Sequence, residues 1–315
     1  MNDPVPTAVA GEPRIHPELR GVARFLPRRA ISRRTVPMVR FALRGLDRMK
    51  RPGVEVCEVG DITVHVHTPP GAQAGRRPAI LWIHGGGFVI GTAAQDHAVC
   101  QRLAKRLGAV VAAVDYRLAP EHPFPVPLED CHDALVWLSE RADVDPQRIV
   151  IAGASAGGGL AAGCALLARQ QGIVTPLLQV LVYPMLDDRT VLRTGIDERN
   201  FRLWTNRSNR FGWTAYLGGP PGAADVSPLA APARETDLAG VCPAWLGVGT
   251  QDLFYEEDLA FVAHLREAGV ECVLHVADGA FHGFDGVAPR AQVTREFWES
   301  AHDAIETALS NSRPE

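Results

Sequence analysis

The stretch IVIAGASAGGGL, residues 149–160, decides the fold of this chain. An apolar run ends at a glycine, a single serine follows, and small apolar residues resume after it. We predict a strand, a very tight turn and a helix, with Ser155 at the turn. The pentad GASAG at 153–157 matches the pattern G-x-S-x-G, in which a strained strand-to-helix turn lifts a nucleophilic hydroxyl clear of a sheet.

The pentad has a simpler interpretation as a Gly-Ser turn before a helix, because the chain contains 30 glycines among 315 residues. Its surroundings favour the catalytic interpretation. A strand-like run at 148–152 precedes it and a helix-like run at 160–168 follows it, as a nucleophile turn requires. A helix that begins just after Ser155 also directs free N–H groups and its positive dipole end at the serine. Such a site suits a tetrahedral oxyanion.

Composition limits the classes of protein that the chain can belong to. With 34.0 kDa and 46% hydrophobic residues, it can bury one large core, so we expect one α/β domain with a cap. The charge of −4, from 32 basic and 36 acidic residues, argues against nucleic acid as a partner. No apolar run reaches the roughly 18 residues of a membrane helix, and no signal peptide is evident. We therefore expect a cytoplasmic protein without a membrane span.

The cysteines also suggest a protein of a reducing compartment. They lie far apart and never form C-x-x-C, so the sequence suggests neither a zinc site nor a disulfide framework. We expect buried free thiols in a reducing compartment. The six are Cys57, Cys100, Cys131, Cys164, Cys242 and Cys272.

Strand and helix patterns alternate on both sides of Ser155. Such alternation predicts an α/β fold with a doubly wound, mostly parallel sheet. A hairpin signal, Gly60-Asp61 within residues 54–68, adds an antiparallel pair at the sheet edge. We expect further strands at 79–83, 110–114, 149–152, 178–183, 244–248 and 270–276, and helices at 99–107, 128–138, 160–168, 259–268 and 295–309.

Two segments interrupt this rhythm. The N-terminal segment, residues 1–52, is rich in proline and arginine and predicts short amphipathic helices at 19–26 and 36–46. We expect it to pack on the domain or to act as a substrate lid, rather than to bind a membrane. The inserted segment, residues 187–225, is rich in aromatic side chains, which suit either packing or a cover over the site.

A serine nucleophile needs a base and an acid that orients the base. In doubly wound sheets such groups follow the carboxyl ends of strands. Among 11 histidines, His282 meets this condition, in the glycine-flanked loop GAFHGF at 279–284. Asp252 meets it after the strand at 244–248, whereas Asp258 falls in a helix. The other histidines considered suit structural roles; they are His16, His97, His132, His264, His275 and His302.

The glycine loop, HGGG at residues 84–87, follows an early strand. Its backbone can turn N–H groups toward a substrate oxygen with no side chain in the way, and the amide of Ala156 can add another donor. We predict an oxyanion hole from Gly85, Gly86 and Ala156, with Gly87 as a further candidate. A phosphate-binding loop is disfavoured, because neither a following Lys-Ser/Thr nor G-x-G-x-x-G is present. Phe88 lies beside the loop and is a candidate substrate contact.

His65 and His67 fall on one face of the second hairpin strand. An H-x-H pair can bind a metal ion, but no acid or cysteine cluster lies nearby in the sequence. We therefore expect a solvated face and no metal site.

These motifs together resemble the hormone-sensitive-lipase branch of the α/β-hydrolases, the bacterial carboxylesterases with an HGGG loop. The resemblance runs from about residue 54 onward and rests on HGGGF at 84–88, DYRLAPEHPFP at 115–125, GASAGGG at 153–159, the Asp252 loop and HGF at 282–284. It implies a helical cap from residues 1–52 and 187–225 over a catalytic domain of residues 53–186 and 226–315. Ala154 departs from the family, which usually has Asp before the nucleophile.

The sequence thus predicts a carboxylic ester hydrolase that works through Ser155, His282 and Asp252 and an acyl-enzyme. We expect a small-molecule ester with a short to medium acyl group as substrate, and no cofactor. Another acyl bond, such as an amide, lactone or carbonate, is an alternative. A non-catalytic binder on the same scaffold, as in the plant gibberellin receptors, is a third. An edge strand or the terminal helix could support a homodimer.

Overall fold

A mixed sheet runs through the computed structural model, which describes residues 14–28, 31–47, 51–71 and 75–312. Within these residues the sheet has eight strands in the order β1-β2-β4-β3-β5-β6-β7-β8. Strand β2 pairs antiparallel with both β1 and β4, and all pairs from β4 to β8 in this order are parallel. The strands are β1 (Val54–Val59), β2 (Ile62–His67), β3 (Arg77–Ile83), β4 (Val110–Asp115), β5 (Val144–Ala154), β6 (Leu178–Val182), β7 (Ala244–Gln251) and β8 (Cys272–Phe281). The predicted fold class is confirmed.

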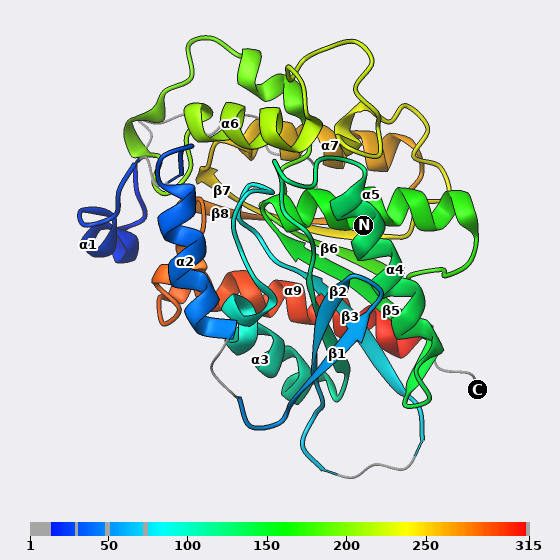
Figure 1. The fold of residues 1–315 in the computed structure, drawn as a ribbon. Coiled ribbons are helices and arrows are strands. Elements are labelled where there is room, and N and C mark those ends of the chain that lie inside the picture. The colour runs from blue at the N-terminus through cyan, green and yellow to red at the C-terminus, as the bar shows by residue number, and fades with distance from the viewer. Residues whose placement is uncertain (1–13, 29–30, 48–50, 72–74, 313–315) are drawn as a thin grey trace.

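Helices cover both faces of the sheet (Figure 1). The α-helices are α1 (Arg20–Ala23), α2 (Val36–Asp47), α3 (His97–Leu107), α4 (Val126–Glu140), α5 (Ala156–Gln171), α6 (Asn206–Leu217), α7 (Tyr255–Glu267), α8 (Phe284–Val287) and α9 (Gln292–Asn311). The 3-10 helices are η1 (Pro17–Leu19), η2 (Ala93–Asp96), η3 (Asp188–Leu192), η4 (Glu198–Asn200) and η5 (Pro232–Arg234). Helices α4, α5 and α7 lie on one face, and α3 and α9 lie on the other.

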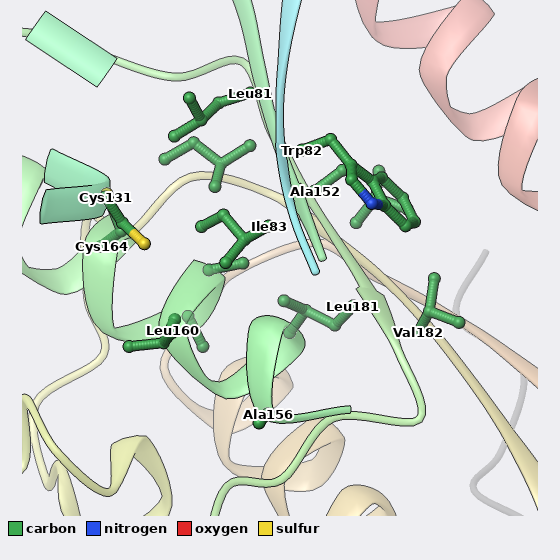
Figure 2. Packing of buried hydrophobic residues seen from close by; sticks show 14 of the residues in the cluster. Leu81, Trp82, Ile83, Cys131, Ala152, Ala156, Leu160, Cys164, Leu181 and Val182 are labelled. Atoms are coloured by element: carbon green, nitrogen blue, oxygen red, sulfur yellow. The ribbon is translucent and has the colours of Figure 1, made fainter. Parts of the chain in front are cut away.

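The core forms because side chains of the central strands alternate between the two helical layers. In Figure 2, Leu81 and Ile83 of β3 point toward Cys131 of α4 and Cys164 of α5. Trp82, between them, points to the other face, where its ring lies 6.2 Å from that of Trp298 on α9. The continuous apolar run at 110–114 is buried throughout, as a parallel strand covered on both faces should be. The cysteines are free thiols, as predicted, but only four of the six are buried, because Cys57 and Cys242 remain partly exposed.

The structure corrects the expectation of a solvated H-x-H face. His67 is 4% exposed, and its ring lies 5.0 Å from the ring of His97, the first residue of α3. Burial lowers the pKa of His67 to about 4, so the ring is neutral at physiological pH. Because α3 and η2 pack against β2, this face is covered rather than solvated. Across the described residues, no group of three or more His, Cys, Asp or Glu side chains is arranged to hold a metal ion.

The N-terminal and inserted segments pack against each other at the top left of Figure 1. The amide of Leu203 donates to Pro27 O at 3.0 Å, and Arg202 Nε donates to Ala23 O at 2.7 Å. The helices of the inserted segment are η3, η4 and α6. The predicted helix at 19–26 consists of η1 and the one-turn helix α1, and residues 1–13 lie outside the described residues. None of the described helices has the length and apolar character needed to cross a membrane.

Candidate active site

Ser155 occupies the turn between β5 and α5 in a conformation that few residues adopt, with φ 57° and ψ −121°. Glycines on either side make the turn possible. A Cβ on Gly153 would lie 2.2 Å from Gly157 O, and a Cβ on Gly157 would lie 2.1 Å from Ile83 O. The G-x-S-x-G spacing therefore reflects close contacts between backbone segments, into which no side chain fits.

Hydrogen bonds to the surrounding backbone hold this strained turn in place. The Ser155 amide donates to Val182 O at 2.9 Å. Its carbonyl accepts from Gly159 N and from Met185 N, both at 3.0 Å. Neighbouring structure thus fixes the backbone at Ser155, as a residue in a sparsely populated region requires.

Three side chains that come from different strand ends form a hydrogen-bonded chain. His282 Nε2 lies 2.9 Å from Ser155 Oγ, and His282 Nδ1 lies 2.8 Å from Asp252 Oδ2. A carboxylate only accepts, so Nδ1 carries the proton and Nε2 of a neutral ring accepts from the serine hydroxyl. Each of the three residues is less than 10% exposed. The structure therefore brings the predicted nucleophile, base and acid together.

Asp252 and His282 lie directly after the ends of β7 and β8, which position them. Asp252 follows β7, and its Oδ1 accepts from Phe254 N at 3.0 Å, which orients the carboxylate. His282 follows β8 directly. Asp258, the alternative acid, lies on α7, where it is fully buried. Of the other histidines, His275 packs on β8 with its ring 5.5 Å from that of Phe297.

Aromatic rings enclose the imidazole of His282. Tyr183 and Phe254 meet it edge to face, with ring centroids at 4.8 and 5.2 Å. Trp204, from the inserted segment, lies at 6.3 Å. No pattern in the sequence singles out Tyr183, and Trp204 is only one of several aromatic residues in the inserted segment. These rings limit the movement of the imidazole and its access to water.

The glycine loop lies directly beside the serine. A Cβ on Gly85 would come within 3.2 Å of Ser155 Cβ. Gly86 has φ +132°, and a Cβ there would lie 1.9 Å from Ile90 O. Across the described part of the chain, the amides of Gly86, Gly87 and Ala156 donate to no backbone carbonyl. They are therefore available to a ligand oxygen, which fits the predicted oxyanion hole without testing it.

Phe88 takes part in packing under the inserted segment. Its ring stacks on Tyr216 of α6 with centroids 4.0 Å apart, and it lies 5.3 Å from Trp213. Only 1% of Phe88 is exposed. Contact between Phe88 and substrate stays a prediction.

The DYRLAPEHPFP stretch, residues 115–125, packs against the start of the glycine loop. Tyr116 Oη donates to His84 O at 3.0 Å, and the Tyr116 ring stacks on the His84 ring at 4.2 Å. Arg117 pairs with the buried carboxylate of Asp130. These contacts give the stretch a structural role beside the site.

Glu257 is a buried acid that sequence analysis missed. Its Oε1 accepts from Leu186 N at 2.8 Å and from Asp187 N at 3.1 Å, and its Oε2 accepts from the Thr190 hydroxyl. Burial raises the pKa of Glu257 to about 8. The signal in the sequence is weak, because nothing separates Glu257 from the exposed acid beside it. Glu257 ties α7 to the start of the inserted segment.

Comparison with known proteins places the chain among hydrolases. A family model described as alpha/beta hydrolase fold matches residues 80–286. The chain is 32% identical to esterase LipI of Mycobacterium tuberculosis over 293 residues, which cover 88% of this chain and 90% of LipI. It is 33% identical to an ethyl acetate hydrolase of Pseudomonas putida over 230 residues, 71% of each chain. A structure titled bacterial heroin esterase superposes with a TM-score of 0.85 at 37% identity, covering 94% of this chain and 98% of that one.

Proposed function

The chain belongs to the alpha/beta hydrolase fold family, in its branch of hormone-sensitive-lipase-like esterases, and on that premise we propose that it is a serine carboxylesterase. The observation that carries the proposal is the hydrogen-bonded chain from Asp252 through His282 to Ser155, at 2.8 and 2.9 Å. The names of its relatives, esterase and ethyl acetate hydrolase, support the same bond type.

The proposed reaction uses these three side chains and the glycine loop. His282 Nε2 takes the hydroxyl proton as Ser155 Oγ forms a bond to the ester carbonyl carbon. Asp252 keeps the imidazole in the required tautomer and stabilises the imidazolium that forms. The carbonyl oxygen becomes an oxyanion, which the amides of Ala156 and of Gly85 or Gly86 stabilise.

Collapse of the tetrahedral intermediate breaks the bond to the alcohol. The alcohol leaves with the proton held by His282 and the acyl group remains on Ser155. Water then attacks the acyl-enzyme, with His282 again as base, and releases the carboxylic acid and free serine. Every step uses protein groups and water.

We also propose that the substrate carries a short to medium acyl group and that both segments form a cap over it. Ser155 is 6% exposed, and Trp204 of the inserted segment lies close to both His282 and the glycine loop. An enclosure lined by aromatic rings suits a compact apolar group. The cap would comprise residues 1–52 and 187–225, and the catalytic domain residues 53–186 and 226–315.

The test compares the native protein with Ser155→Ala on p-nitrophenyl esters of increasing acyl length. We expect turnover that peaks at short or medium chains and falls by about 10⁴- to 10⁶-fold in the variant. Circular dichroism confirms that the variant is folded. Equal turnover of both proteins would overturn the proposal. If an amide of the preferred acyl group is hydrolysed faster than the matching ester, the protein is an amidase rather than an esterase.

A further inference from the structure

One arginine of the N-terminal segment joins helix α2 to the loops beside the active site. Arg40 Nε donates to Val89 O at 2.7 Å, and Arg40 Nη2 donates to Ala119 O at 2.6 Å. Arg40 Nη1 donates to both carboxylate oxygens of Glu121, at 2.8 and 2.9 Å. All three nitrogens of the guanidinium are used, and the side chain is 18% exposed.

Val89 belongs to the turn that closes the glycine loop. Gly86 O accepts from Val89 N at 3.2 Å and from Ile90 N at 3.1 Å. The next carbonyl back, Phe88 O, accepts from Ala119 N at 3.0 Å. Two successive carbonyls of the loop are therefore anchored from outside, Phe88 O by Ala119 and Val89 O by Arg40. Because Arg40 also holds Ala119 O, it supports both anchors.

The glycine loop needs an external anchor of this kind. Gly86 and Gly87 both have positive φ, at +132° and +59°, and neither has a side chain that could lock its backbone by packing. The direction of their amides depends on how the end of the loop is held. Oxyanion stabilisation requires donors that are fixed before the charge develops, since reorientation during the reaction would cost free energy.

We propose that Arg40 is a positioning residue that fixes the oxyanion loop through the carbonyls of Val89 and Ala119. The proposal rests on the function proposed above, because it concerns the same glycine loop. Arg40 does not touch the reacting atoms. Its planar fork can donate in three directions at once, and a lysine ammonium on a flexible stem cannot reproduce that arrangement. The N-terminal segment thereby gains a role in catalysis beyond covering the site.

The experiment measures kcat and KM on the preferred p-nitrophenyl ester for Arg40→Ala and Arg40→Lys. Arg34→Ala is the matched control, because Arg34 lies exposed on the turn just before α2. We expect Arg40→Ala to lose about 10- to 100-fold in kcat, as small misplacements of catalytic groups do, with KM changed less than about threefold. Arg40→Lys should lose nearly as much, and Arg34→Ala should match the native protein.

A second measurement separates positioning from loss of structure. A trifluoromethyl ketone adds to the serine and places an oxyanion in the hole, so its affinity should fall by the same factor as kcat/KM in the Arg40 variants. Glu121→Gln, which leaves Arg40 in place, should cost less activity than either Arg40 variant. If Arg40→Ala does not fold, Arg40→Lys decides the matter. A native kcat in folded Arg40→Lys, or a loss carried by KM alone, would overturn the inference.

The two proposals fail in different ways. If Ser155→Ala keeps full activity, the proposed function itself is wrong. If Ser155→Ala is inactive but the Arg40 variants behave like Arg34→Ala, the function stands and only the positioning role is wrong.

Discussion

The turn at Ser155 and the inserted segment above it meet at the same site but are held by different kinds of contact. At the turn, backbone lies against backbone, with a Cβ on Gly157 only 2.1 Å from Ile83 O. In the inserted segment, side chains make the contacts, and Trp204 reaches His282 and Gly87 with its ring. A glycine packed against backbone cannot be replaced without moving that backbone, whereas a side chain that makes a contact can be replaced by another of similar shape. The chemistry is therefore fixed by the turn, and the shape of the enclosure depends on the segment above.

The largest expected effect is a substitution that adds one methyl group to the turn. Gly157→Ala places a Cβ within 2.1 Å of Ile83 O and 2.5 Å of His84 O, so β3 or α5 must shift. We expect the free energy of unfolding to fall by about 1–3 kcal/mol, as overpacking does, and ester hydrolysis to be lost. Urea denaturation and the p-nitrophenyl assay measure the two effects.

The control for this substitution comes from the N-terminal segment. Gly45 lies in α2, and nothing approaches within 4 Å of a Cβ there. Gly45→Ala should raise stability by up to about 1 kcal/mol, because alanine favours the helix. If Gly157→Ala and Gly45→Ala have equal effects, the contrast between the two regions is wrong.

The next effect tests the contact between the two regions. A Cβ on Gly87 would lie 2.1 Å from the ring of Trp204, and the backbone has φ +59°. We expect Gly87→Ala to lower kcat about 10- to 100-fold, because both the ring and the backbone resist it. The double variant with Trp204→Ala removes the steric part and should recover part of the loss. If kcat does not recover, the clash with Trp204 does not contribute to the loss, and backbone strain at residue 87 alone causes it.

The turn and its partners could be predicted from the sequence because they obey local rules. Glycine is required wherever backbones touch, and in an α/β sheet reactive groups follow strand ends, which selected His282 and Asp252. The structure then brought these residues into hydrogen-bonding distance of Ser155. The positions of most strands and helices followed from apolar runs, apart from shifts of a few residues at the ends, but the order of the strands in the sheet was not predicted.

The remaining contacts depend on packing between distant segments. Arg40 was one of many arginines in the sequence, and nothing local indicates that it binds carbonyls 49 and 79 residues away. The solvated interpretation of His67 was wrong for the same reason, since the alternation along β2 cannot show that α3 covers this face. Trp204 was recognised as aromatic, but its place beside His282 depends on how the whole inserted segment folds.

The last expected effect concerns stability rather than catalysis and involves Glu257, which joins the two regions. The folded protein holds the pKa of this buried carboxyl at about 8, whereas an unfolded glutamate titrates near 4.3. Between these values the folded state keeps a proton that the unfolded state has released. Stability must then fall as pH rises through this window, by at most about 1.4 kcal/mol per pH unit. Glu257→Gln removes this contribution, because a glutamine stays neutral and its side-chain oxygen can still accept from the amides of Leu186 and Asp187.

Urea denaturation of the native protein and Glu257→Gln at pH 5.5, 7 and 8.5 tests whether Glu257 makes stability fall as pH rises. As pH rises, the free energy of unfolding of Glu257→Gln should increase relative to that of the native protein. At pH 8.5 the variant should be the more stable of the two. Glu256→Gln is the control, because its carboxylate is largely exposed and pairs with Arg193, so its pH dependence should follow that of the native protein. Parallel curves for Glu257→Gln and the native protein would mean that Glu257 is ionised in the folded state. The link between α7 and the inserted segment would then depend on a buried charge, held by the two amides and the Thr190 hydroxyl.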